Sequence, residues 1–120
     1  MEYKAAGPSN TLDATNVTLL TDDASKAEGK AIFDKNCVVC HLAQGQGLVG
    51  PNLTDEYWIH GCKIGQIFNI ITVGVPDKGM ISWQTQLTPE QLQKVASYIV
   101  SLQGTNPPNP KPPQGDLCKM

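Results

Sequence analysis

The chain has 120 residues, of which 40% are apolar and 17% charged, which is typical of one globular domain and not of a disordered or collagen-like protein. Its longest apolar stretch, residues 17–20, is far shorter than the ~20 residues that a membrane-spanning helix needs, so the chain itself is expected to be soluble. All nine basic residues are lysines and the net charge is −2. This composition argues against nucleic acid as a partner, because phosphate recognition relies on clustered basic residues and on arginine.

The first half of the chain is predicted to hold an arm, a helix and a loop. Residues 1–21 show no helical spacing of apolar residues, which predicts an extended arm with one short strand near Val17–Leu20. Two aspartates then precede apolar residues at helical spacing, which predicts a helix over residues 24–36. Residues 42–54 contain several glycines and a Gly-Pro pair, which predicts a loop.

Further helices are predicted in the second half. A short helix near residues 55–60 is followed by an isoleucine-rich helix over residues 63–73, and glycines and a proline then predict a second loop. The last helix has the clearest signals, because Thr88 is a suitable N-cap, Pro89 occupies the first turn and Gln91 completes a capping box.

The C-terminal residues are predicted to leave this last helix at Gly104 as an extended tail. Five prolines fall within residues 105–120, which favours a polyproline-like segment that lies on the surface or leads away from it. The expected organisation is therefore an all-α domain over residues 22–104, between the arm of residues 1–21 and the proline-rich tail.

Residues 37–41 read Cys-Val-Val-Cys-His, the Cys-x-x-Cys-His pattern of covalent c-type haem attachment. Two thiols at this spacing can bond to the vinyl groups of one porphyrin edge, while the neighbouring imidazole reaches the iron. A zinc site would need a second ligand pair, and a thioredoxin-like redox pair would need alternating strands and helices, neither of which the sequence contains. The motif predicts one haem c attached through Cys37 and Cys40, with His41 as an axial iron ligand.

Met80 is predicted to be the second axial ligand, because it is the only methionine that is not at a chain end. It follows a glycine in a turn and is separated from His41 by a helix, so the chain can approach the opposite face of the haem. His60 is the rival ligand, and an open iron position is the third possibility.

The choice of ligands decides the chemistry. A histidine and methionine pair leaves no vacant iron position for oxygen or peroxide, and the thioether raises the reduction potential relative to two histidines. Such a domain transfers electrons and is not an enzyme by itself. An open iron would instead indicate a haem enzyme or a gas sensor.

Over residues 22–104 the chain resembles class I c-type cytochromes. Gly29 and Phe33 match positions in the first helix of that family, and Val95 and Tyr98 match the positions in its last helix that cross against them. The resemblance implies a class I cytochrome c fold, with three to five helices around one covalently bound haem.

The Gly50-Pro51-Asn52-Leu53 segment is similar to the family loop that packs on the histidine side of the haem. The resemblance implies that the Pro51 carbonyl accepts a hydrogen bond from Nδ1 of His41, which would fix the tautomer of the imidazole. It also places Pro51 and Leu53 among the residues that contact the cofactor.

Residues 50–61, 74–83 and 101–116 resemble the haem c subunit of cbb-type haem-copper oxidases. The resemblance implies a domain at the periplasmic face of the bacterial cytoplasmic membrane, tethered by a helix upstream of this sequence. It also implies redox partners among the other subunits of a terminal oxidase, to whose oxygen-reducing subunit electrons would pass. The domain itself is expected to be monomeric. A free periplasmic shuttle and the haem domain of a dehydrogenase remain alternatives.

Tyr57, Trp58 and Trp83 match aromatic residues of the haem pocket in the same family, although an ordinary core position would also account for them. Because the chain has no arginine, buried haem propionates would need backbone N–H groups, indole or phenol groups, or lysine as donors. Trp83 and Tyr57 are the first candidates among the side chains.

Two further cysteines, Cys62 and Cys118, remain once the haem motif has taken the first pair. In an oxidising compartment they can form a disulfide, which would tie the proline-rich tail to the domain. Closing a loop from residue 62 to residue 118 would add ~4 kcal/mol of stability. The alternative is a buried free thiol at Cys62 with a disordered Cys118.

Overall fold

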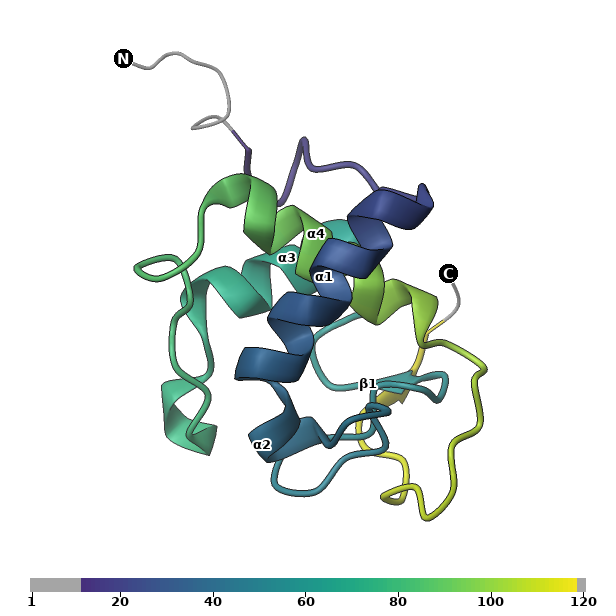
Figure 1. Cartoon of the computed structure of the whole chain (residues 1–120). Helices are drawn as coiled ribbons and strands as arrows, with labels where there is room; N and C mark the ends of the chain where they lie inside the picture. The colour runs from purple at the N-terminus through teal and green to yellow at the C-terminus, as the bar shows by residue number, and fades with distance from the viewer. Residues whose placement is uncertain (1–11, 119–120) are drawn as a thin grey trace, which may run out of the picture.

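A computed structural model describes residues 12–118 and shows helices joined by long loops (Figure 1). The elements in chain order are α1 (Asp23–Asn36), α2 (Val38–His41), β1 (Tyr57–Trp58), α3 (Ile64–Val73), the 3-10 turn η2 (Pro76–Lys78), α4 (Pro89–Ser101) and β2 (Asp116–Leu117). The all-α class is confirmed, as are the helices predicted over residues 24–36, over residues 63–73 and after Thr88. Across residues 12–118, no helix combines the length and the apolar content needed to cross a bilayer.

The crossing of α1 over α4 depends on a glycine. A Cβ added to Gly29 would lie 2.2 Å from the carbonyl oxygen of Lys94 and 2.9 Å from Cβ of Tyr98, so only glycine allows this approach. Next to it the rings of Phe33 and Tyr98 pack with their centroids 5.4 Å apart, and Val95 is fully buried. The predicted contact between the first and last helices is confirmed.

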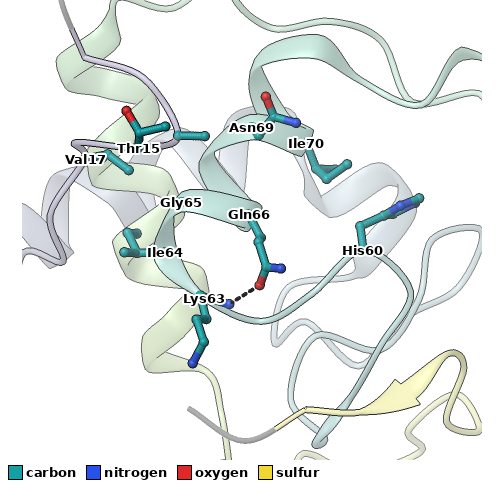
Figure 2. A pocket seen from close by; sticks show the side chains of 10 residues that line it. Thr15, Val17, His60, Lys63, Ile64, Gly65, Gln66, Asn69 and Ile70 are labelled. Carbon is teal, nitrogen blue, oxygen red and sulfur yellow. Dashed lines mark hydrogen bonds between the residues drawn. The ribbon is translucent and has the colours of Figure 1, made fainter.

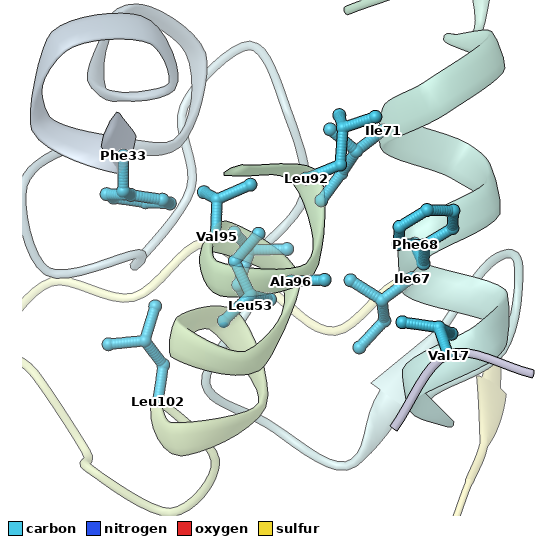
Figure 3. Packing of buried hydrophobic residues seen from close by; sticks show 11 residues of the cluster. Val17, Phe33, Leu53, Ile67, Phe68, Ile71, Leu92, Val95, Ala96 and Leu102 are labelled. Carbon is cyan, nitrogen blue, oxygen red and sulfur yellow. The ribbon is translucent and has the colours of Figure 1, made fainter. Parts of the chain in front are cut away.

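The hydrophobic core lies where α4 faces α3 and α1 (Figure 3). Apolar residues at helical spacing line the facing sides of α3 and α4, because only one stripe of each amphipathic helix is turned inwards. The buried members are Ile67, Phe68 and Ile71 of α3 and Leu92, Val95, Ala96 and Ile99 of α4, with Phe33, Leu53 and Leu102 beside them. Met80 and Trp83 pack against this cluster as half-buried residues.

The predicted short helix over residues 55–60 is wrong, because this segment bonds to the C-terminal residues instead. Tyr57 pairs with Leu117 and Trp58 with Asp116 in an antiparallel ladder, and the Cys118 N–H donates to the Glu56 carbonyl at 2.7 Å. Aromatic residues favour such an extended conformation once a partner strand is present.

The predicted strand near Val17–Leu20 is also wrong, since these residues have extended backbone without a partner strand. They pack on the helices instead: Val17 joins the core cluster, and the Leu20 N–H donates to Oγ of Ser97 at 3.0 Å. The first part of the predicted arm, residues 1–11, lies outside the described residues.

Residues 105–118, here called the C-terminal strap, run across the loops that precede β1 (Figure 1). The strap begins where Gly104 donates to the Thr54 carbonyl at 2.9 Å, and further along the Lys111 N–H donates to the Gln46 carbonyl at 2.8 Å. It ends at β2, next to a bond between the sulfur atoms of Cys118 and Cys62. The strap is therefore held at both of its ends and at one point between them.

Candidate haem site

The two cysteines of the motif lie where α1 passes into α2. The Cys37 N–H closes the last turn of α1 by donating to the Phe33 carbonyl at 2.8 Å, and the His41 N–H donates to the Cys37 carbonyl at 3.0 Å. One helical turn therefore brings Cys37, Cys40 and His41 to one short segment. Both thiols are free and half-buried, as two attachment points for a flat group would be.

The chemistry of the thiols argues against a redox pair. Burial raises the pKa of Cys37 to about 11, with a smaller contribution from the neighbouring Cys40. A reactive cysteine of the thioredoxin type has a lowered pKa instead, because the thiolate is the nucleophile. The zinc alternative also lacks support, since the described residues contain no group of three or more Cys, His, Asp or Glu side chains that could hold a metal ion.

His41 is held in one orientation by Pro51. Its Nδ1 lies 2.9 Å from the Pro51 carbonyl, the contact that the sequence predicts. A carbonyl can only accept, so Nδ1 carries the proton and Nε2 keeps its lone pair. Burial lowers the pKa of His41, a hydrogen bond to Pro51 opposes this, and the charge of Lys111 lowers the pKa further. The imidazole is consequently neutral near pH 7, the form that binds a metal ion.

Gly50 forms part of the wall around this imidazole. A Cβ at Gly50 would lie 2.4 Å from Cε1 of His41 and 2.8 Å from each ring nitrogen, so no larger residue fits. The loop is folded back on α2 because the N–H groups of Leu48 and Gly50 both donate to the Cys40 carbonyl, at 3.1 Å and 2.9 Å. The loop thus fits closely around His41 and leaves Nε2 as the ring atom for a ligand.

Met80 is held by a turn that follows α3. Its backbone forms two hydrogen bonds with Val75, at 2.8 Å and 3.1 Å, around the 3-10 turn η2. The loop beyond is tied to α3, because Oγ of Ser82 donates to the Thr72 carbonyl at 2.6 Å and the Trp83 N–H donates to the Ile71 carbonyl at 3.1 Å. Met80 is half-buried and packs against the core cluster, so the turn presents its side chain inwards.

Comparison with known proteins decides the family. A family model described as cytochrome c oxidase, cbb3-type, subunit III matches residues 24–99. The chain belongs to this family.

Two curated members of the cbb3-type subunit family are each 38% identical to the chain over the aligned residues. One is the cbb3-type cytochrome c oxidase subunit FixP of Azorhizobium caulinodans, matched over 91 residues that cover 69% of this chain and 31% of that protein. The subunit CcoP of Rubrivivax gelatinosus matches over 87 residues, which cover 72% of this chain and 29% of that protein. The chain therefore spans less than a third of the length of these relatives.

Two solved structures share the cytochrome fold. Cytochrome cL from Methylophaga aminisulfidivorans superposes with a TM-score of 0.64 at 25% identity, covering 69% of this chain and 56% of that protein. Cytochrome cL from Hyphomicrobium denitrificans gives a TM-score of 0.61 at 26% identity, covering 68% and 50%. The predicted class I cytochrome c fold is confirmed, and membership of the cbb3-type subunit family implies haem c as the cofactor.

The remaining predicted residues lie in different surroundings. Leu53 is buried in the core cluster, and Trp83 packs against that cluster. Trp58 donates its indole N–H to the Asp55 carbonyl at 3.1 Å, and Tyr57 is 40% exposed at the surface. Trp58 is half-buried and packs against the core cluster, whereas Tyr57 is the more exposed of the two aromatics of β1.

His60, the rival iron ligand, is exposed and faces a groove between the N-terminal arm and α3 (Figure 2). Lys63, Gln66 and Asn69 line the same groove, but neither His41 nor Met80 does. The arrangement gives His60 no support as an iron ligand.

The residues of the Cys-x-x-Cys-His motif and the loop beside it fit a haem. Two free thiols lie one turn apart, a neutral imidazole keeps Nε2 for a metal, and Gly50 leaves only enough space for the ring of His41. Cys37 and Cys40 would hold the porphyrin edge, while His41 and Met80 would bind the iron.

Two residues that make contacts on the His41 side, Asn52 and Lys111, are hard to identify as such from the sequence. Asn52 is buried and accepts from both the N–H and the hydroxyl of Thr54, at 2.9 Å and 2.7 Å, while its amide donates to the Lys111 carbonyl at 3.3 Å. Lys111 is marked in the sequence only as a charge between prolines. Its contact with the loop of residues 42–54 depends on the path of the strap.

Cys62 and Cys118 are bonded in the structure, with sulfur atoms 2.03 Å apart and Cα atoms 6.0 Å apart. Cys62 is fully buried just before α3, and its N–H also donates to Sγ of Cys118 at 3.2 Å. The bond fastens the end of the strap to the segment that leads into α3.

Proposed function

We propose that the chain is an electron-transfer domain with one haem c, attached through Cys37 and Cys40 and bound at the iron by His41 and Met80. The observation that carries the proposal is the hydrogen bond of 2.9 Å from Nδ1 of His41 to the Pro51 carbonyl. His41 directly follows Cys40, and the thiols of Cys37 and Cys40 are free and half-buried. The domain covers residues 22–104 and is flanked by the arm and the proline-rich tail.

The residues on the His41 side fix the orientation of a ligand and pack closely against it. Pro51 removes rotational freedom from the imidazole and raises its basicity, because a donated Nδ1 proton places more electron density on Nε2. Gly50 lets the loop backbone close against the ring. A haem bound here would supply a one-electron ferric/ferrous couple. Ligands held in a fixed geometry would keep the reorganisation energy of electron transfer low.

The residues on the Met80 side support the proposal that the domain is not an enzyme by itself. The backbone bridge to Val75 holds Met80 in place, and the core cluster supports its side chain. With His41 and Met80 both bound, oxygen or peroxide would find no vacant position at the iron. Electron transfer through the exposed part of the cofactor is the remaining activity.

The ligand assignment is tested by spectroscopy of the holoprotein. Wild-type ferric protein should show the near-infrared band of a thioether bound to ferric iron, and the ferrous protein should bind carbon monoxide poorly. Met80→Ala should lose the band and bind carbon monoxide readily, whereas His60→Ala should behave like wild type. A band that survives in Met80→Ala would contradict the assignment, and mass spectrometry should find one haem per chain.

The partner is proposed from family membership. We infer that the domain passes electrons to the oxygen-reducing subunit of a cbb3-type oxidase at the periplasmic face of the cytoplasmic membrane. A free periplasmic shuttle would carry the same haem site but would not remain with the oxidase. The test is to tag the complete gene product and isolate it from washed membranes, where it should copurify with the haem-copper subunit. Recovery only in the soluble periplasmic fraction would favour the shuttle.

A further inference from the structure

Lys111 lies across the loop that surrounds His41. Its N–H donates to the Gln46 carbonyl at 2.8 Å, its carbonyl accepts from the Asn52 amide at 3.3 Å, and its ammonium Nζ donates to the Val49 carbonyl at 3.4 Å. The backbone of one strap residue is therefore fixed at two points of the loop, and its charged end is directed to a third.

The points that Lys111 contacts flank the groups that hold His41. Val49 directly precedes Gly50, which packs against the imidazole, and Asn52 directly follows Pro51, which accepts from Nδ1. The ammonium is thus held on the histidine side of the site.

The loop itself carries no charge that competes with Lys111, but Asp55 directly follows the loop and lines the same cavity as Lys111. Residues 42–54 contain no Asp, Glu, Lys or Arg, and the strap carries only one further charged side chain, that of Asp116 in β2. Lys111 is half-buried as a residue, but its hydrogen bond to Val49 is exposed, so water still screens part of its charge.

We propose that Lys111 acts on the haem site through its charge. The strap holds its ammonium against the Val49 carbonyl, on the His41 side, where the positive charge favours the reduced over the oxidised iron. Reduction adds one negative charge to the group that His41 ligates, and a nearby cation stabilises the state with the lower positive charge. This inference rests on the proposed function, because it requires His41 on the iron.

The first test compares midpoint potentials of purified holoproteins. Lys111→Gln should favour oxidation by about threefold or more, a fall of about 28 mV at 59 mV per tenfold change for one electron. Lys111→Arg keeps the charge and should restore most of the potential. Lys26→Gln is the matched control, because Lys26 lies about 16 Å along α1 from Cys37 at 1.5 Å per residue. An unchanged potential in Lys111→Gln, or an equal fall in Lys26→Gln, would overturn the proposal.

The second test asks whether the strap positions the charge. A Cβ at Gly115 would lie 2.4 Å from the backbone of Trp58, so Gly115→Val should loosen the strap without touching Lys111. The effect of Lys111→Gln should then shrink in a double-mutant cycle, and Cys118→Ser provides the same background by a second route. An undiminished effect in both backgrounds would refute positioning by the strap.

The same samples separate this inference from the proposed function. If the thioether band is present and Lys111→Gln leaves the potential unchanged, only the role of Lys111 is refuted. If the band is absent but the potential still falls, the Met80 assignment fails while the role of Lys111 on the His41 side stands. A chain that attaches no haem would refute both.

Discussion

Gly50 occupies a position where the imidazole of His41 leaves no room for a side chain, with an added Cβ only 2.4 Å from Cε1. We expect Gly50→Ala to displace either the loop or the ring, at a cost of about 1–3 kcal/mol in the free energy of unfolding of the holoprotein. The displacement should also alter the visible spectrum, because it changes the orientation of the ligand. Urea denaturation and absorption spectroscopy measure the two effects.

Gly104→Ala is the control for this prediction. An added Cβ there meets nothing within 4 Å, so only the strain of a positive φ of 77° is expected, and the spectrum should not change. A wild-type spectrum and wild-type stability in Gly50→Ala would show that the imidazole is not confined by this glycine.

Contacts of single residues were predictable from sequence only where the partners are near in the chain or share a known loop pattern. His41 ends α2 and Pro51 lies ten residues later in the loop that follows, and their contact was predicted. Lys111 reaches the same loop from sixty residues away, and no local pattern encodes that distance. The indole of Trp58 was matched to a haem pocket, and its hydrogen bond to the nearby Asp55 carbonyl was not predicted.

At the level of helices, the crossing of α1 and α4 predicts whether Gly29→Ala raises or lowers the stability of the protein. In an isolated helix, Gly→Ala stabilises by about 0.5–1 kcal/mol. Gly29→Ala should instead destabilise the protein by about 1–3 kcal/mol, because the new Cβ would lie 2.2 Å from the Lys94 carbonyl oxygen. Thermal or urea unfolding measures the change, and Ala31→Gly at an exposed position of α1 measures the propensity term alone. A stabilised Gly29→Ala protein would contradict the close crossing.

The strap makes a second prediction at this level. Without the bond between Cys62 and Cys118, the unfolded chain gains the freedom of a loop with a sequence separation of 56, so Cys118→Ser should cost about 4 kcal/mol. Leu117→Ala keeps the bond and is exposed, so its effect should stay below about 0.5 kcal/mol. Denaturant titration compares the two variants, and thiol counting on unfolded holoprotein should find new thiols only after reduction. Free thiols before reduction would disprove the bond.

Helices could be predicted because their signals are local, and strands could not because theirs are not. Thr88 and Gln91 form the capping box that their spacing predicts, and α3 keeps the periodic isoleucines that indicated it. β1 exists only because β2 comes back beside it, so the same residues were predicted to form a helix. The extended residues near Val17 are likewise fixed by the surface of the helices and not by their own pattern.

Over the whole molecule, the charge predicts weak electrostatic steering. The net charge is −2 and the basic residues are lysines spread along the chain. We expect the rate of electron exchange with a small anionic oxidant to change by less than about tenfold between low and physiological salt. Stopped-flow measurements with anionic and cationic reagents check this, and the two should differ little. A steep salt dependence would reveal a concentrated charged surface.

The bond at the end of the strap also changes what a single cut in the backbone can do. α3, the turn before Met80, and α4 all lie between Cys62 and Cys118, whereas Cys37, Cys40 and His41 lie before this covalent ring. A protease that cleaves one peptide bond inside the ring would therefore release nothing, since both pieces stay joined through sulfur. The nicked protein should migrate as one species until it is reduced, and both predicted iron ligands should remain in the same covalent molecule.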